Sequence, residues 1–242
     1  MLTVFYDRSV KQKLYLSWSS GKDSAWALHI LKRQANYEIA GLVTTFNAAF
    51  DRVAMHSTRR KLVEIQALAA GLPLIAVPLP WPCSNAEYET IMTSVCRQAV
   101  DRGVKTFAFG DLFLADIRAY RERQLQGTGL EPIFPLWQIP TDKLAEEMID
   151  GGLRAKLVCV DPAKLDSKFV GRDFDRALLS GLPVGVDPCG ENGEFHTFAY
   201  AGPMFNQAIE IVSGERVQRD GFWFCDLLPG KEAADEPAAA RC

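Results

Sequence analysis

The stretch Ser19-Ser20-Gly21-Lys22-Asp23-Ser24 decides the fold of the first half of the chain. The apolar segment before it, 13–18, predicts a strand, and the periodic segment after it predicts a helix over 24–32. Small residues let a backbone approach an anion closely, and a helix N-terminus presents N–H groups and the positive end of the helix dipole. This stretch therefore predicts an anion-binding turn between a buried strand and a helix.

The side chains of this turn suit a phosphate. Ser19 and Ser24 add hydroxyl donors, Lys22 adds a cation, and Asp23 adds a carboxylate of the kind that holds Mg²⁺. The Walker A motif is excluded, because Leu16 stands where its first glycine belongs and Asp23 follows the lysine directly. An ordinary capped turn is the alternative, but such turns rarely combine two serines with glycine, lysine and aspartate.

Strand and helix patterns alternate through the first half of the chain. We expect strands over 13–18, 39–46, 74–77, 105–109 and 133–136. We expect helices over 24–32 and 114–125, with two more between them, capped by Ser57 and Asn85 and ended by Gly71 and Gly103. This alternation predicts an α/β fold, a Rossmann-like parallel sheet with helices on both faces, which binds ligands beyond the carboxyl ends of its strands.

The pattern changes after about residue 138 and predicts a smaller mixed α+β domain. Its expected elements are a helix over 141–150, strands over 153–160, 194–200 and 222–227, a short helix over 173–180, and a hairpin turning at Ser213-Gly214. We therefore expect a first domain over 1–130, a second over 131–229, and a mobile tail over 230–242.

Composition narrows the class of protein. The chain has 242 residues, 48% of them hydrophobic and 24% charged, and a net charge of -3, which is ordinary for a globular protein and gives no basic footprint for nucleic acid. The uncharged stretch 65–86 contains four prolines and so cannot form one membrane helix. Six cysteines without a C-x-x-C pair, together with an N-terminus unlike a signal peptide, predict reduced thiols and a cytoplasmic location.

A second chemistry-bearing segment, residues 185–198, reads GVDPCGENGEFHTF. It crowds glycines, three acids, Cys189 and His196 into a loop that leads to a predicted strand. Taken singly, Cys189 is typical of a core thiol and His196 of a structural histidine, and a solvated acidic loop is the alternative for the whole segment. The concentration of these residue types favours a functional loop.

The two segments carry a resemblance to known enzymes. The stretch 19–24 resembles the PP-loop of ATP pyrophosphatases, whose usual form is SGGxDS, with Ser20 in place of the first glycine. A serine fits there if the position does not need a positive φ. Over nearly its whole length the chain resembles the diphthine–ammonia ligase family. Besides this loop, the residues that carry the resemblance are 55–56, 84–85, 88–89, 110–111, 135–137, 170–172 and, most diagnostic of all, 185–198.

This resemblance implies a reaction and a domain plan. It implies an adenine nucleotide α-hydrolase-like (HUP-type) domain first and a substrate-recognition domain second. A carboxylate attacks the α-phosphate of ATP and releases pyrophosphate, and ammonia then displaces AMP from the acyl-adenylate to give an amide. Charge on the leaving pyrophosphate would be stabilised by the helix N–H groups, by Lys22 and by Mg²⁺.

The resemblance and the positions of residues also imply roles. The residues expected to bind pyrophosphate are Ser19, Ser20, Gly21, Lys22, Asp23 and Ser24. Those expected to bind Mg²⁺ are Asp23 and Asp111. Thr44, Thr45 and Phe46 are the residues expected to flank adenine or ribose, with core packing as the alternative for Phe46. Gly110 is expected near the nucleotide, and His56 either reaches the nucleotide or caps the following helix. The residues expected to recognise the substrate and ammonia are Glu191, Asn192, Glu194 and His196. Asp111 is a second candidate for binding ammonium.

Several alternatives remain open. Arg118, Arg121 and Arg123 form either a solvated helix face or a contact to an anionic substrate. The chain could instead be a PP-loop enzyme that modifies tRNA, or a nucleotide-binding sensor without turnover. The implied partners are ATP, ammonium and a carboxylate acceptor, which is diphthine on a translation elongation factor in archaea or eukaryotes and another carboxylate in bacteria. A homo-oligomer is also compatible with the sequence.

Overall fold

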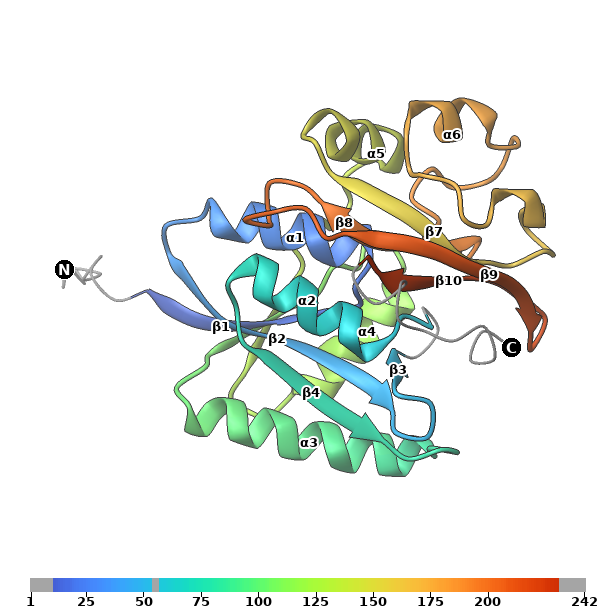
Figure 1. The fold of residues 1–242 in the computed structure, drawn as a ribbon. Coiled ribbons are helices and arrows are strands. Elements are labelled where there is room, and N and C mark those ends of the chain that lie inside the picture. Colours follow the sequence, from blue (N-terminus) through green and yellow to red (C-terminus); the bar gives the residue numbers. More distant parts are fainter. Residues whose placement is uncertain (1–10, 54–56, 231–242) are drawn as a thin grey trace.

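The computed structural model describes residues 11–53 and 57–230 (Figure 1). Five parallel strands make the first sheet, in the order β4-β2-β1-β5-β6. Their bounds are Gln12–Ser17 (β1), Tyr37–Asn47 (β2), Leu74–Leu79 (β4), Thr106–Ala108 (β5) and Glu131–Ile133 (β6), and the short β3, Arg52–Val53, runs antiparallel to the end of β2. The chain order along the sheet reverses between β1 and β5, as in a doubly wound fold.

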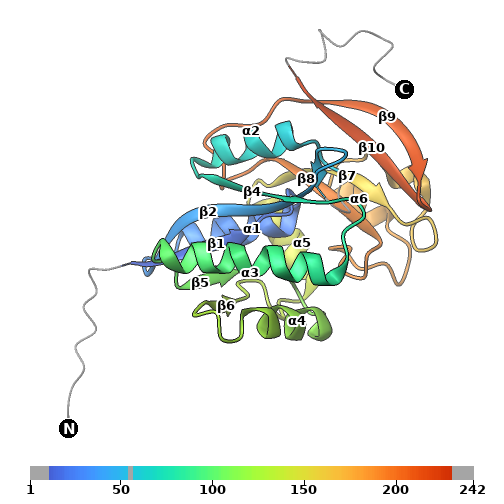
Figure 2. The same ribbon diagram turned by 90° about the horizontal axis from the view of Figure 1, so that it is seen from below.

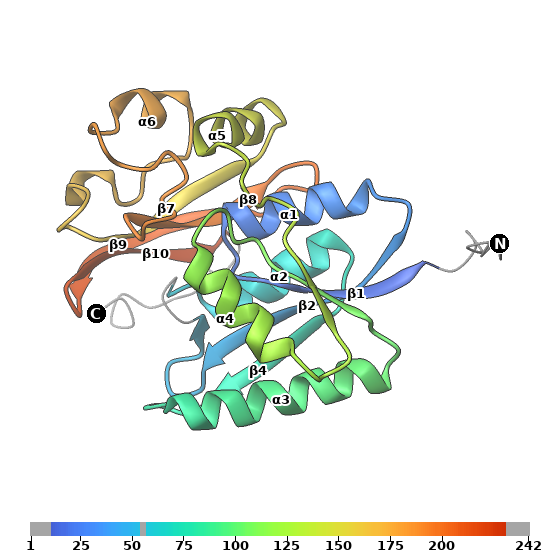
Figure 3. The same cartoon turned by 180° about the vertical axis from the view of Figure 1, so that it is seen from behind.

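Helices cover both faces of this sheet, which confirms the Rossmann-like prediction. The helices α1 (Lys22–Lys32) and α2 (Arg60–Ala70) pack with Leu14 and Leu16 of β1 on one face. The helices α3 (Asn85–Asp101) and α4 (Ala115–Leu125) pack with Tyr15 and Phe107 on the other. Figure 2 shows α3 crossing that second face, and Figure 3 brings α4 to the front. Alternate residues of β1 thus serve opposite cores, because successive side chains of a strand point to opposite faces.

The second half of the chain forms an antiparallel sheet that lies over the α1 and α2 face (Figure 1). Its order is β8-β7-β10-β9, with bounds Arg154–Val160 (β7), Phe195–Ala201 (β8), Ile211–Arg219 (β9) and Phe222–Pro229 (β10). Three helical elements flank it: α5 (Thr141–Asp150), the 3₁₀ turn η1 (Ser167–Phe169) and α6 (Arg176–Gly181). A single cluster of buried apolar residues runs from β1 and α1 into β7 and β8, so the two sheets share one core.

Three predicted boundaries were wrong. The third helix is capped by Ser84 rather than Asn85, because Ser84 and Glu87 form a reciprocal capping box. The N-cap of helix α2 is Arg59 rather than the predicted Ser57, which lies two residues earlier with a φ of 54°. The strand expected over 133–136 is β6, which ends at Ile133.

The last hairpin also turns at a different place from the one expected. Asp220 and Gly221 both have positive φ, 50° and 87°, and this conformation matches the twist of two antiparallel strands. Ser213 and Gly214 lie inside β9 instead, where Ser213 pairs with Leu227. Within the ranges described, no helix is long and apolar enough to cross a membrane. Predictions for His56 and for the tail beyond Gly230 fall outside the described residues.

Candidate active site

A cavity of about 980 Å³ lies where β1, β2 and β5 end. The turn after β1 lines it with Ser19, Lys22, Asp23 and Ser24, and residues 189–191 and 195–197 line it from the second half of the chain. The cavity therefore lies at the switch point of the sheet, where doubly wound folds bind their ligands.

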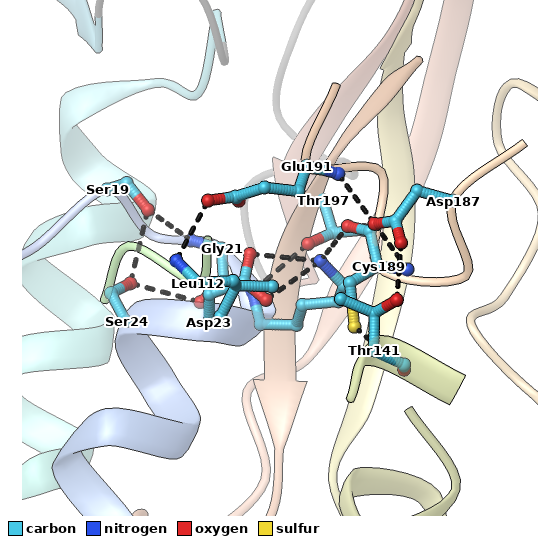
Figure 4. A network of polar contacts seen from close by, with 11 residues as sticks. Ser19, Gly21, Asp23, Ser24, Leu112, Thr141, Asp187, Cys189, Glu191 and Thr197 are labelled. Atoms are coloured by element: carbon cyan, nitrogen blue, oxygen red, sulfur yellow. Dashed lines mark hydrogen bonds and ion pairs between the residues drawn. The ribbon is translucent and has the colours of Figure 1, made fainter. Parts of the chain in front are cut away.

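The turn after β1 is built from short polar contacts (Figure 4). The hydroxyls of Ser19 and Ser24 lie 3.2 Å apart, and the Ser24 hydroxyl also donates to the Gly21 carbonyl at 3.0 Å. The N–H of Lys22 donates to Thr197 Oγ1 at 3.0 Å, which attaches the start of α1 to β8. The anion-binding turn is thus held from both halves of the chain.

Ser20 has a φ of 70°, so the condition under which a serine fits this position freely is not met. The left-handed region costs a non-glycine residue about 1–2 kcal/mol. A compensating contact is present, because the fully buried Ser20 hydroxyl donates to Thr58 Oγ1 at 3.0 Å. The sequence departs from SGGxDS at the one position where the structure needs glycine-like geometry, and Thr58 supplies a partner for the replacement.

Lys22 joins the turn to the second segment. Its ammonium lies 2.9 Å from both carboxylate oxygens of Asp23, donates to the Cys189 carbonyl, and lies 5.5 Å from the centre of the Phe195 ring. Burial has the largest effect on the pKa of Lys22 and lowers it, but the nearby Asp23, Cys189 and Glu191 together outweigh burial, and the net pKa is raised. Burial raises the pKa of Asp23, against the effect of the Lys22 ammonium.

Asp187 shapes the loop that follows (Figure 4). Its Oδ2 accepts from the N–H groups of Cys189 and Glu191 at 3.1 and 2.9 Å, and Thr141 donates its hydroxyl to Oδ1. Its own N–H donates to Glu194 Oε1 at 3.0 Å. Glu194 is 3% exposed and does not line the cavity, and its contact with the Asp187 N–H supports the loop.

Glu191 points back toward the turn and lines the cavity. Its Oε1 accepts from the N–H of Leu112 at 2.8 Å. Burial raises the pKa of Glu191 to about 7, against the effect of that N–H and with a further contribution from Asp23. Burial also raises the pKa of Asp111, and Asp23 adds to this. Three carboxyl groups, those of Asp23, Asp111 and Glu191, thus face one cavity and influence one another.

His196 lines the same cavity from β8. Burial, together with the charges of Lys22 and Lys164, lowers the pKa of His196 to about 4. The imidazole is therefore neutral at pH 7 and can exchange hydrogen bonds without carrying charge. Cys189 is buried, burial strongly raises the pKa of its thiol, and its Sγ donates to the Thr141 carbonyl at 3.4 Å, so it is a poor nucleophile.

The residues predicted at the end of β2 separate into two groups. Thr45 lines the cavity. Thr44 is buried and donates its hydroxyl to the Trp18 carbonyl at 2.8 Å, while Phe46 lies in the core under the guanidinium of Arg60. The structure therefore brings Thr45 to the site and leaves Thr44 and Phe46 outside the lining.

Gly110 lines the cavity, and its lack of a side chain has a structural cause. A Cβ at this position would lie 3.1 Å from the Ser24 nitrogen and 3.2 Å from the Asp23 carbonyl carbon. The end of β5 thus packs directly on the first turn of α1, so the position needs glycine for close approach of two backbones.

Gln66 supports the turn after β1 without lining the cavity, and the sequence analysis missed it. It is fully buried on α2, accepts from the Trp18 indole N–H at 2.8 Å, and donates to the carbonyls of Ser20 and Ala199 at 3.0 and 2.7 Å. A glutamine one turn after Leu62 on the apolar stripe of a predicted helix was the available signal.

Among the described residues, no three acids, histidines or cysteines are grouped as a ready-made metal site. The residues nevertheless fit Mg²⁺, which uses one or two carboxylates and completes its shell with phosphates and water. Asp23 and Asp111 both line the cavity, and Asp111 Oδ2 is buried without a hydrogen-bond partner in the described part of the chain.

The doubly wound sheet, the turn at its switch point and the acidic loop beside it define a Rossmann-like α/β protein with a candidate anion-binding site. Two family models match the chain, the diphthamide synthase N-terminal domain over residues 12–132 and the diphthamide synthase C-terminal domain over residues 140–231. The chain belongs to the diphthamide synthase family, and the resemblance noted from the sequence is confirmed.

Several curated relatives are similar. A diphthine–ammonia ligase of Bos taurus is 26% identical over 222 residues, covering 82% of each chain. Diphthine–ammonia ligases of Homo sapiens and Schizosaccharomyces pombe are 32% and 30% identical over 110 and 113 residues. These two alignments cover 43% and 45% of this chain and only 41% and 19% of the relatives, so the chain spans part of their length.

Proposed function

We propose that this protein is an ATP-dependent ligase that activates a carboxylate as an acyl-adenylate and transfers ammonia to it, releasing AMP and pyrophosphate. The observation that carries the proposal is the ion pair of Lys22 with Asp23, capped by the carbonyl of Cys189. It joins the anion-binding turn and the acidic loop at one cavity. Phosphate chemistry and recognition of a second substrate thus have a common location.

The nucleotide would place its β- and γ-phosphates at the turn after β1. The hydroxyls of Ser19 and Ser24 and the charge of Lys22 face that part of the cavity. These groups offset the negative charge that grows on pyrophosphate as the bond from the α-phosphate breaks. Thr45 supports placing the nucleoside at the end of β2. Mg²⁺, held by Asp23 and Asp111, would supply further charge neutralisation when bound.

Ammonia is the second reactant, and Glu191 is suited to it. Ammonium must lose a proton before its nitrogen attacks the acyl carbon, and a carboxylate with a pKa of about 7 accepts that proton near neutral pH. Asp111 and Asp23 add negative charge beside it, which favours a cation in this part of the cavity. Glu194 acts in this scheme by holding the loop through Asp187.

The acceptor and the setting belong to the same proposal. The relatives' names make diphthine the first candidate for the carboxylate, carried on a translation elongation factor where the source makes it. The described cysteines are Cys83, Cys96, Cys159, Cys189 and Cys225, and all are free thiols, which is typical of a reducing cytoplasm.

The test is product analysis. The protein is incubated with ATP, Mg²⁺, ammonium and an elongation factor that carries diphthine, and AMP, pyrophosphate and the amide are measured. The expected result is one AMP and one pyrophosphate for each amide formed, with turnover abolished in a folded Asp23→Ala variant. Release of ADP and phosphate, or full activity of Asp23→Ala, would refute the proposal. AMP formed only with tRNA would favour a tRNA-modifying enzyme, and binding of ATP without any turnover would favour a sensor.

A further inference from the structure

The cavity extends between α3 and α4, away from the turn after β1. We use the name α3–α4 chamber for the part lined by Tyr88 and Met92 of α3, Tyr120 and Arg121 of α4, and Phe109 of the sheet. The two helices lie on the same face of the sheet (Figure 2). The whole cavity, about 980 Å³, is at the upper end of the roughly 300–1,000 Å³ typical of ligand sites. It has room for a second ligand beside a nucleotide.

Two charged atoms in this chamber form an ion pair without a hydrogen bond. Arg121 Nε and Asp111 Oδ2 are buried, and neither makes a hydrogen bond within the described ranges 11–53 and 57–230. They lie 3.8 Å apart, close enough for an ion pair but too far for a hydrogen bond to each other. Arg121 Nε thus has no accepting atom, and a ligand oxygen beside the guanidinium can supply one. The Arg121 guanidinium also lies 5.1 Å from the centre of the Phe109 ring, which fixes its plane over an apolar floor.

The charges of the cavity leave Arg121 as the suitable anchor for a carboxylate. Lys22 is already paired with Asp23 and with the Cys189 carbonyl. A guanidinium can hold a carboxylate through parallel hydrogen bonds, a geometry that an ammonium lacks.

The sequence left three arginines of α4 as equal candidates, and the structure separates them. Arg118 pairs with Glu122 at 2.8 Å, and its guanidinium lies 4.8 Å from the centres of both the Phe134 and Trp137 rings, outside the cavity lining. Arg121 and Arg123 both line the cavity, but Arg123 is exposed, whereas the Arg121 side chain is 27% exposed. Arg118 therefore serves as a matched control on the same helix.

We propose that the α3–α4 chamber binds the acceptor of the reaction, that Arg121 holds its carboxylate, and that the aromatic and apolar walls take its stem. The ligand class is a carboxylate on an apolar or aromatic stem. This inference rests on the proposed function, and it adds a location and a residue for the substrate that becomes adenylated. Because the proposed function places the phosphates at the turn after β1, we expect the acceptor to bind in the chamber without displacing the nucleotide.

The test separates binding from turnover. The probe is 4-phenylbutyrate, with its neutral amide as a comparison, observed by saturation-transfer NMR on protein loaded with α,β-methylene-ATP. We expect the carboxylate to bind the loaded wild type and Arg118→Met alike, and to bind Arg121→Met about tenfold more weakly or not at all. Arg121→Lys keeps the charge but loses the parallel donors, so it should fall between them. Circular dichroism confirms that each variant is folded.

Some outcomes would overturn this inference and leave the proposed function standing. Competition between the probe and α,β-methylene-ATP would assign the chamber to the nucleotide. Equal binding of acid and amide, no binding of the acid to wild type, or undiminished binding by Arg121→Met would exclude Arg121 as the anchor. Failure of the proposed function would appear elsewhere, as no AMP from wild type with the diphthine-bearing acceptor. Where turnover is measurable, Arg121→Met should raise KM for the acceptor and leave KM for ATP within about twofold.

Discussion

The strongest single prediction concerns Gln66, which connects the two halves of the chain under the active site. We expect Gln66→Leu to destabilise the protein markedly although leucine fits the apolar core of α2. The substitution removes one acceptor, used by the Trp18 indole, and two donors, used by the carbonyls of Ser20 and Ala199. All of these contacts are buried, so water cannot replace the lost partners.

The magnitude follows from which groups are left unsatisfied. Ser20 keeps a second hydrogen bond, because its carbonyl also accepts from the Ala199 N–H at 2.9 Å. The Trp18 N–H and the Ala199 carbonyl lose the partner that Gln66 gave them, and each costs about 1–3 kcal/mol when stranded in the core. With about 1 kcal/mol for the bond lost at Ser20, the sum is about 3–7 kcal/mol. That is a large part of the roughly 5–15 kcal/mol that stabilises a typical domain.

Equilibrium unfolding in urea measures this change as a lower midpoint. The matched control is Gln98→Leu, since Gln98 lies exposed on α3 and its amide makes only a long contact of 3.4 Å with Ser94. We expect the control to stay within about 0.5 kcal/mol of wild type. A loss below about 1 kcal/mol for Gln66→Leu would refute the reasoning, because it would mean that the three contacts are not needed.

Three further outcomes are expected. Ser20→Gly should relieve the strain of the positive φ but leave the Thr58 hydroxyl without its partner. It should therefore change the free energy of unfolding little in wild type and stabilise a Thr58→Val background by about 1 kcal/mol. An equal effect in both backgrounds would contradict this coupling. Glu191 has an ordinary pKa of 4.5 and a native pKa of about 7, so between these pH values the native state binds a proton that the unfolded state has lost. Wild type should therefore lose stability relative to Glu191→Gln as the pH rises through that interval. Amide formation should rise through pH 7 only in wild type. A flat difference in pH-dependent unfolding, or the same activity limb in Glu191→Gln, would remove that role. Gly110→Ala should displace the first turn of α1 and raise KM for ATP. The control Gly181→Ala should leave KM for ATP unchanged, because its Cβ would meet only Arg172 at 3.7 Å. Unchanged ATP kinetics in Gly110→Ala would show that the close approach is dispensable.

The local order of the chain was predictable from the sequence. Strand β1, the turn at 19–24 and helix α1 follow from an apolar run, small residues and a periodic stripe, all of which act over a few neighbours. The same holds for the α/β alternation and the Gly71 stop, where φ is 68°. Boundaries failed where two caps compete, as at Ser84 and Asn85, because the winner depends on which side chain reaches the backbone N–H.

The chemistry of the site was predictable only as a set of residue types. The sequence placed Lys22, Asp23 and Glu191 in two segments far apart, but not the contact between them. It could not distinguish Glu194, which holds the loop, from Glu191, which faces the cavity, since both are acids in one short segment. Orientation of this kind depends on which backbone N–H groups the loop turns inward.

What the sequence determined by itself was an α/β protein with a strand–turn–helix unit whose residue types suit a phosphate, because short-range chemistry and periodicity are sufficient for both. What only the tertiary structure decided was the positive φ of Ser20, the buried contacts of Gln66 and the position of Arg121 inside the cavity. Each of these depends on contacts between elements far apart in the chain. Burial then gives them their effect, because it raises the pKa of Glu191 and leaves Arg121 Nε without water.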